Sequence, residues 1–310
     1  MNEFELIRRL TRDLPSNRHV VTGAGDDCAV LDLEVPNSEV LFKTDSVVEG
    51  IHFTKDTAPE RIGHKALARC LSDIAAMGGS AISVLVTLAL PTGFDPKSIE
   101  AIYTGMTELA KRYEVSISGG ETTSNPERLL ISIAALGLVP KGKSVLRSGA
   151  RAGDAIFVTG ELGGSIQGKH LEFEPRIPEA QWLAQNFPIH AMIDLSDGVA
   201  SDLRHILNQS KVGAELLSDA IPISRAARSQ ARAESSAKPP LLAALTDGED
   251  FELLFTVASK DAVPLLDAWK KKFPKLRLSC IGKVNAKSGI RLNDKTGSRE
   301  LTLHGYMHFA

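Results

Sequence analysis

Residues 60–90, ERIGHKALARCLSDIAAMGGSAISVLVTLAL, predict a helix followed by a strand. In the first part, apolar residues recur with the period of an amphipathic helix, and Gly78 is a usual place for such a helix to end. The apolar run AISVLVTLAL that follows has strand character and is too short to cross a bilayer. A helix that leads into a strand in this way is typical of α/β and α+β proteins.

Helices and strands are expected to alternate along the rest of the chain. In the first half, we expect strands at CAVLDL, EVLFKT and RLLISIAALGLV and a helix at PKSIEAIYTGMTELAKRY. In the second half, we expect strands at DAIFVTG, PIHAMIDL, FELLFTVA and LRLSCIGKV, with helices at GVASDLRHILNQS and DAVPLLDAWKKK. The linker-like stretch PKGKSVLRSGARAG joins the halves. We therefore predict a two-domain protein of mixed α/β and α+β class, with domains at residues 1–140 and 141–310.

The composition is that of a soluble globular protein, and we expect a cytoplasmic one. The 310 residues are enough for two domains, each with its own core. The 36 basic and 38 acidic residues leave a net charge of −2, which gives no electrostatic signature for binding nucleic acid or an anionic membrane. The start, MNEFELIRRLTRDL, lacks the apolar stretch of a secretory signal. Cys28, Cys70 and Cys280 are isolated, so we expect buried or half-buried thiols instead of a zinc site or disulfides.

Residues 137–144, GLVPKGKS, match the spacing of a phosphate-binding P-loop. A working P-loop needs a helix directly after it, whose N-terminal N–H groups meet the phosphates. The next residues, VLRSGARAGD, have no helical period, and Pro140 lies inside the loop. We therefore interpret Lys143 as a solvated linker residue.

Acidic residues beside apolar strands offer another way to hold phosphate. They lie in GAGDDCAVLDL, KTDSVVEGIHF, LSDIAAMGG, ISGGETTS and MIDLSDGVASD. A carboxylate at the end of a buried strand is costly unless a cation meets it, and few basic residues are nearby in the sequence. Such oxygen ligands suit Mg²⁺, which leaves coordination positions to water and phosphate. The alternative for each is a cap or turn residue, and for Asp197 that alternative is equally good.

Two glycine-rich stretches, GAGDD and SGGETTS, are predicted as turns in which main-chain N–H groups approach an anion. Asp202 and Asp219 lack such surroundings, and we expect them at the surface. The turns and the carboxylates together predict a site for phosphate and Mg²⁺.

Taken in order, eight segments resemble the thiamine-monophosphate kinases, a branch of the family that includes aminoimidazole ribonucleotide synthetase. They are GAGDDCAVL, TDSVVEGIHF, KALARCLSDIAAMGG, SGGETT, VLRSGARAGDAIFVTG, IDLSDGVASDL, DGEDFELLF and HGYMHFA. The resemblance covers nearly the whole chain, from residue 23 to residue 310. The reactive Cys or selenocysteine of the selenophosphate synthetases and the terminal Cys of the hydrogenase-maturation relatives have no counterpart here.

The resemblance implies transfer of the γ-phosphate of ATP to thiamine monophosphate. It also implies a homodimer in which two N-terminal mixed sheets form a barrel, and a C-terminal α/β domain. Several Mg²⁺ ions are expected with the ATP. The implied metal ligands are Asp27, Thr44, Asp45, Asp73, Glu121, Asp194 and Asp197. The implied ATP contacts are Tyr103, Gly120, Glu121, Arg147 and Ser196, and the implied thiamine-phosphate contacts are His52, Glu249 and Tyr306.

Two positions depart from the family pattern. Glu121 stands where the family usually has Asp, and Lys43 replaces the small residue expected before the Thr-Asp pair. Neither departure removes a carboxylate, so an active enzyme is still expected. No general base is needed, because a phosphate monoester has a second pKa of about 6 and is mostly dianionic at neutral pH.

Several alternatives stay open. His52 is either a substrate contact or a core histidine, and Glu121 either faces the metal ions or is a solvated turn residue. The alternative functions are an ATP-dependent ligase of the aminoimidazole ribonucleotide synthetase type and a nucleotide-binding module that has lost catalysis.

Overall fold

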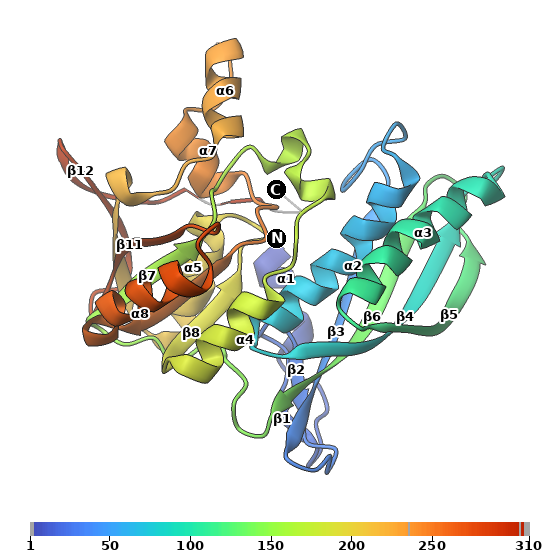
Figure 1. Ribbon diagram of the computed structural model, residues 1–310, viewed down its shortest axis with the longest axis horizontal. Coiled ribbons are helices and arrows are strands. Elements are labelled where there is room, and N and C mark those ends of the chain that lie inside the picture. The colour runs from blue at the N-terminus through green and yellow to red at the C-terminus, as the bar shows by residue number, and fades with distance from the viewer. Residues whose placement is uncertain (1–2, 235, 304, 307–310) are drawn as a thin grey trace. The chain divides into compact units, whose positions relative to one another are not determined.

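The computed structural model describes residues 3–234, 236–303, 305 and 306, and the chain divides into two compact units (Figure 1). The N-terminal unit holds Arg18–Ser144 and His170–Ile177. The C-terminal unit holds Met1–Asn17, Val145–Lys169 and Pro178–Ala310. The division into domains after residue 140 stays a prediction, because each unit also takes a short segment from the other side of that boundary.

The N-terminal unit is built on a six-stranded mixed sheet, which confirms the predicted sheet type. In spatial order the strands are β1 (Val20–Thr22), β2 (Ala29–Leu31), β3 (Ser38–Val48), β6 (Leu130–Pro140), β4 (Ser80–Leu90) and β5 (Ser116–Ser124). Neighbours are antiparallel except β4 and β5, which are parallel. A parallel pair needs a crossover connection, and the predicted helix between these two strands provides it.

Two helices, α2 (Pro59–Ala76) and α3 (Pro96–Arg112), pack side by side, and α2 also contacts β3, β4 and β6 (Figure 1). Two glycines allow the close approach of the helices. A Cβ on Gly63 would lie 1.8 Å from the carbonyl oxygen of Ile102, and one on Gly105 would lie 1.9 Å from that of Glu60. The helix predicted at residues 60–78 therefore forms, and it is buried along most of its length.

The sheet face opposite these helices is apolar and exposed. Leu41 is fully buried, whereas the next residue, Phe42, is 47% exposed, as expected when successive strand residues point to opposite faces. Phe42 pairs with Leu136 on β6, which is 38% exposed, and Leu85 on β4 is 51% exposed. Exposed apolar side chains gathered on one sheet face are typical of an interaction surface.

The C-terminal unit is built on a seven-stranded sheet. In spatial order its strands are β13 (Gly297–Glu300), β12 (Gly289–Asp294), β9 (Gly213–Leu217), β11 (Leu278–Asn285), β7 (Asp154–Thr159), β10 (Leu253–Ala258) and β8 (Ile189–Asp194). Only β9 and β12 pair in parallel among these neighbours. The four strands expected in this half, at DAIFVTG, PIHAMIDL, FELLFTVA and LRLSCIGKV, are confirmed as β7, β8, β10 and β11. The strands β9, β12 and β13 were not predicted.

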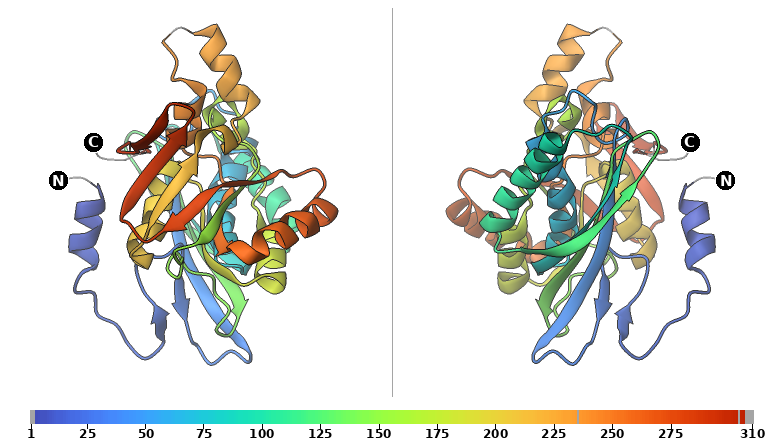
Figure 2. Two further views of the ribbon diagram at one scale, coloured as in Figure 1. Left: turned by 90° about the vertical axis from the view of Figure 1, so that its left-hand side faces the viewer. Right: turned by 90° about the vertical axis from the view of Figure 1, so that its right-hand side faces the viewer.

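Helix α5 (Val199–Ser210) forms the main core of this unit with one face of the sheet, including Ile156 and Val158 of β7. Phe157 points to the other face and stacks on Phe255 at 5.5 Å between ring centroids. Helix α8 (Ser259–Lys272) packs against β7, β10 and β11, and its Trp269 meets Trp182 of α4 (Ile177–Asn186). The remaining helices are α1 (Glu3–Thr11), α6 (Arg225–Ala233) and α7 (Pro240–Thr246), the last two in contact with each other (Figure 2).

Two local predictions are wrong. The stretch SGGETTS is not a turn, because it lies in β5 beside β4. A Cβ on Gly120 would lie 1.8 Å from the carbonyl oxygen of Val86, so the strand pairing itself requires this glycine. Cys28 and Cys70 are buried as expected, but Cys280 is exposed because it lies at an outward position of β11. In the part of the chain that the structure describes, no helix combines the length and apolarity needed to span a bilayer.

Candidate functional site

Asp45, a predicted metal ligand on β3, is bound by a guanidinium group of the neighbouring helix. Nε of Arg69 lies 3.0 Å from Oδ2 of Asp45, and Nη2 lies 3.2 Å from Oδ1. The Ser46 N–H also donates to Oδ1 at 2.7 Å. Burial raises the pKa of Asp45, but Arg69, Lys43 and these hydrogen bonds outweigh burial and lower the pKa below its usual value. Asp45 is therefore a carboxylate with both oxygens engaged.

Asp73, the predicted ligand on α2, is also paired with a cation. Nζ of Lys43 on β3 lies 3.1 Å from Oδ2 of Asp73. Burial acts to lower the pKa of Lys43, but the charges of Asp73 and Asp45 outweigh burial and raise that pKa above its ordinary value. The expectation that few cations meet these carboxylates is therefore wrong. It failed because Lys43 and Arg69 come from a strand and a helix that only tertiary packing brings together.

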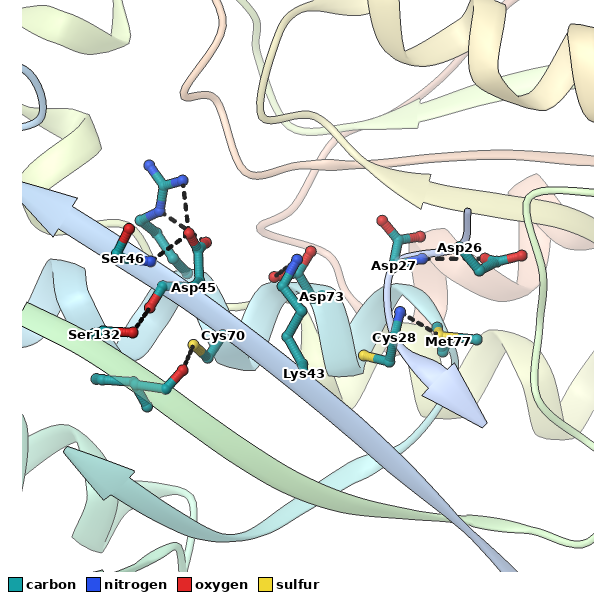
Figure 3. Close-up of polar contacts among 12 residues, drawn as sticks. Asp26, Asp27, Cys28, Lys43, Asp45, Ser46, Cys70, Asp73, Met77 and Ser132 are labelled. Atoms are coloured by element: carbon teal, nitrogen blue, oxygen red, sulfur yellow. Dashed lines mark hydrogen bonds and ion pairs between the residues drawn. The ribbon is translucent and has the colours of Figure 1, made fainter. Parts of the chain in front are cut away.

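We call Lys43, Asp45, Arg69 and Asp73 the β3–α2 charge cluster. Figure 3 labels Lys43, Asp45 and Asp73. Asp27, in the turn between β1 and β2, has a carboxylate oxygen within 4.8 Å of one on Asp73. The predicted turn at GAGDD is confirmed, and Asp27 is only 2% exposed. Thr44 is exposed and points away from its neighbours Lys43 and Asp45, so the structure does not bring the Thr44 hydroxyl to this cluster.

The N-terminal unit also carries three of the five residues predicted to contact ATP, whereas Arg147 and Ser196 belong to the C-terminal unit. Tyr103 lies half-buried on α3, where burial raises the pKa of its phenol. Gly120 and Glu121 lie on β5, an edge strand of the sheet. Glu121 is exposed, and its Oε1 accepts a hydrogen bond at 2.9 Å from the N–H of Thr122. Their roles toward ATP and metal stay predictions.

His52 follows β3 and is 8% exposed. Its Nδ1 accepts a hydrogen bond from the Val48 N–H at 3.0 Å, so the proton of the neutral ring lies on Nε2. The fully buried Lys65 donates to the carbonyl oxygen of His52 at 2.7 Å. A ring that accepts a main-chain hydrogen bond is typical of a core histidine. The same hydrogen bond would also orient the ring for a substrate contact, so both interpretations of His52 stay open.

In the C-terminal unit, the loop between β8 and α5 carries Asp194, Ser196 and Asp197. Asp194 ends β8 and is 3% exposed, whereas Ser196 and Asp197 are half-buried. Gly198 precedes α5 with a φ of +99°, a conformation that side chains disfavour. The strand end and the helix start thus hold two predicted metal ligands, Asp194 and Asp197, and one predicted ATP contact, Ser196, within four consecutive residues.

Asp202 holds this loop from inside α5 and corrects our expectation that it lies at the surface. It is 2% exposed, and its Oδ2 accepts from the N–H groups of Asp197 at 3.1 Å and Gly198 at 2.9 Å. Burial first, and then the charges of Asp197 and Asp194, raise the pKa of Asp202 well above its ordinary value, while Arg147 acts to lower it. The available signal was the four-residue spacing from Gly198, which places the side chain over the helix start. Asp219 is exposed, as expected.

Main-chain hydrogen bonds join two further predicted residues to this loop. The N–H of Glu249 donates to the carbonyl oxygen of Ser196 at 2.7 Å, and the N–H of Tyr306 donates to that of Asp197 at 3.0 Å. Glu249 has a φ of +54°, so its backbone is strained into the left-handed region. The structure thus brings four of the predicted residues together around one loop.

The arrangement fits divalent cations differently in the two units. In the C-terminal unit, ligand atoms of Asp197, Asp202 and His205 lie within 4.8 Å of one another, so two carboxylates and an imidazole could together hold a divalent cation. In the β3–α2 charge cluster, Arg69 and Lys43 already neutralise Asp45 and Asp73. A metal ion on either of those carboxylates would compete with a resident cation.

The P-loop match has no helix behind it. Residues 141–153, all of them described, contain turns and irregular backbone, and Lys143 is exposed. The interpretation of Lys143 as a solvated linker residue agrees with this conformation.

Comparisons with known proteins agree along the chain. The family model "AIR synthase related protein, N-terminal domain" matches residues 25–139, and "AIR synthase related protein, C-terminal domain" matches residues 151–295. A solved structure described as AaThiL complexed with AMPPCP and TMP superposes with a TM-score of 0.82 at 28% identity, covering 99% of this chain and 97% of that one.

Curated relatives narrow the family further. The thiamine-monophosphate kinase of Bacillus subtilis is 34% identical, with the whole of both chains covered. The thiamine-monophosphate kinase of Rhodopirellula baltica is 40% identical, with 97% of this chain and 95% of the relative covered. This protein therefore belongs to the AIR synthase related family and, within it, to the thiamine-monophosphate kinases.

Proposed function

We propose that this protein transfers the γ-phosphoryl group of ATP to thiamine monophosphate by direct in-line displacement, giving thiamine diphosphate. The observation that carries the proposal is the loop at Ser196 and Asp197, which hydrogen bonds join to Glu249 and Tyr306. Ser196 is assigned to ATP and Asp197 to metal, whereas Glu249 and Tyr306 are assigned to the thiamine phosphate. The names of the full-length relatives support the same reaction.

The proposed phosphoryl transfer needs positive charges held close to the phosphates, and it does not need a general base. The acceptor phosphate is mostly dianionic at neutral pH, because its second pKa is about 6. Bound Mg²⁺ ions would offset the repulsion between the acceptor and the triphosphate. Asp194 and Asp197 are assigned to hold metal, and Arg147 supplies a fixed positive charge. We place the reaction in the cytoplasm, where ATP is supplied and free thiols such as those of this chain stay reduced.

The decisive assay incubates the protein with ATP, Mg²⁺ and thiamine monophosphate and measures thiamine diphosphate. A ligase of the aminoimidazole ribonucleotide synthetase type would leave thiamine monophosphate unchanged, and an inactive module would bind ATP without turnover. Lys143→Ala is a suitable control, because the exposed side chain lies outside the assigned residues. Absence of thiamine diphosphate with folded, ATP-bound protein would refute the proposed reaction.

Glu121→Ala is expected to lower turnover at least about tenfold, whereas Glu121→Asp keeps most of it and changes the Mg²⁺ requirement. Glutamate adds about 1.3–1.5 Å of reach relative to aspartate, and Mg²⁺ accepts little deviation from about 2.0–2.1 Å. The test measures rates across a Mg²⁺ titration for both variants. Unchanged rate and unchanged Mg²⁺ dependence in Glu121→Ala would make Glu121 a solvated edge-strand residue.

We also propose that the protein is a homodimer formed through the exposed apolar face of the N-terminal sheet. Phe42, Leu85 and Leu136 lie on this face, where a second copy would cover them. Leu85→Asp is therefore expected to give a monomer at micromolar concentration in sedimentation velocity. Val263→Asp, at an apolar side chain of α8 that is 66% exposed, is the matched control and should stay dimeric. A monomeric wild type would contradict the proposed dimer.

A further inference from the structure

The β3–α2 charge cluster pairs acids and bases in a crossed arrangement. Lys43 and Asp45 lie two residues apart on one face of β3, and Arg69 and Asp73 lie four residues apart on one face of α2. Each element therefore presents one base and one acid. Lys43 meets Asp73 and Arg69 meets Asp45, with side-chain exposures between 10% and 23%.

Lys43 stands among three carboxylates assigned to metal. Figure 3 shows its ammonium group beside Asp73, with Asp45 on one side and Asp27 on the other. A divalent ion shared by Asp27 and Asp73, whose oxygens lie within 4.8 Å, would approach the carboxylate that already holds Lys43. Mg²⁺ binds carboxylate oxygens at about 2.0–2.1 Å, so the two cations would repel each other at short range.

The net charge of the side chains around Lys43 also disfavours a second cation there. Asp27, Asp45 and Asp73 carry three negative charges when ionised, and Arg69 alone would leave two of them uncompensated. Lys43 lowers that excess to one, and the affinity of an oxygen site for a divalent ion depends on the charge of its ligands. The Lys43–Asp73 ion pair is also not explained by fold stability alone, because a buried ion pair adds little stability over apolar packing.

We propose that the Lys43 ammonium group takes the place of one divalent cation at this part of the site, with Asp73 holding it in position. The chain then binds one metal ion fewer than it would with a small residue at position 43. This inference rests on the proposed function only in assuming that divalent ions bind near Asp27 and Asp73. The metal-binding test below needs no catalysis, so its failure can be distinguished from a failure of the proposed reaction.

The experiment compares Mn²⁺ binding to metal-stripped wild type, Lys43→Ser and Lys43→Met, using electron paramagnetic resonance to count free Mn²⁺. Both variants are expected to bind one additional ion per chain, or to bind Mn²⁺ at least about tenfold more tightly, because both lose the resident charge. Lys43→Met keeps the side-chain volume, so a gain in Lys43→Ser alone would reflect added space and would overturn the proposal. Isotherms that superimpose on wild type would also overturn it.

A thermal-unfolding series gives a second readout and a matched control. Without metal, Lys43→Met leaves Asp73 without its Lys43 partner and should melt below wild type, and millimolar Mg²⁺ should restore its melting temperature more than it raises that of wild type. Lys141 pairs with Asp32 at 2.6 Å in the same unit but is exposed, so Lys141→Met should show neither effect. Equal Mg²⁺ responses of wild type and Lys43→Met, or failure of Lys43→Met to fold even with Mg²⁺, would refute the exchange of one cation for another.

Discussion

Asp73→Asn is expected to lower the turnover of thiamine monophosphate by about a thousandfold, a loss of about 4 kcal/mol of transition-state stabilisation. The Asp73 side chain is 10% exposed, has an oxygen within 4.8 Å of one on Asp27, and holds the ammonium group of Lys43. Under the proposed reaction, its removal would take away the negative charge that holds Lys43, and any divalent ion shared with Asp27, near the phosphates. Steady-state rates at saturating ATP and Mg²⁺ check the prediction. A variant within tenfold of wild type would make Asp73 a purely structural residue.

The same substitution should destabilise the fold, which a double variant can separate from catalysis. Breaking a buried ion pair by removing one partner costs about 3–5 kcal/mol, because the other charge stays buried. Lys43→Met combined with Asp73→Asn removes both charges and should therefore be more stable than Asp73→Asn alone, while turnover stays low. If the double variant unfolds as easily as the single one, the pair does not carry that stability.

Asp202→Ala is expected to lower turnover by about a hundredfold, a loss of about 3 kcal/mol, although Asp202 is assigned to neither substrate. Its Oδ2 accepts two hydrogen bonds, from the N–H groups of Asp197 and Gly198, and these fix the loop that carries the assigned metal and ATP residues. Loosening that loop should raise the Mg²⁺ concentration needed for half-maximal rate as well as lower the rate. A fall in stability with unchanged kinetic constants would contradict this positioning role.

Asp202→Asn is the matched variant, because an amide oxygen can accept both hydrogen bonds at the position of Oδ2. We expect it to keep turnover within about tenfold of wild type, well above that of Asp202→Ala. If asparagine fails as badly as alanine, the charge itself is needed. Asp202 would then act as a metal ligand with Asp197 and His205, whose ligand atoms lie within 4.8 Å of it.

Local sequence patterns predicted the secondary structure correctly where a segment's own residues decide it. The helical period of residues 60–78 and the apolar run at residues 81–90 predicted α2 and β4, because burial of one helix face and pleated packing leave a direct mark on the sequence. The glycines and Pro140 around GLVPKGKS excluded a P-loop helix for the same reason. The strands β1, β9, β12 and β13 were missed, because none of them contains a long apolar run.

The sequence by itself determined the mixed α/β class, the principal helices and strands, and the family, whose motifs extend over nearly the whole chain. Only the tertiary structure decided which charges meet. Arg69 reaches Asp45 across 24 residues of chain because α2 packs on β3, and Lys43 reaches Asp73 in the same way. Burial of Asp202 and the strand at SGGETTS likewise depend on neighbours distant in sequence. Electrostatic and hydrogen-bond partners are set by distance in space, which a one-dimensional pattern does not contain.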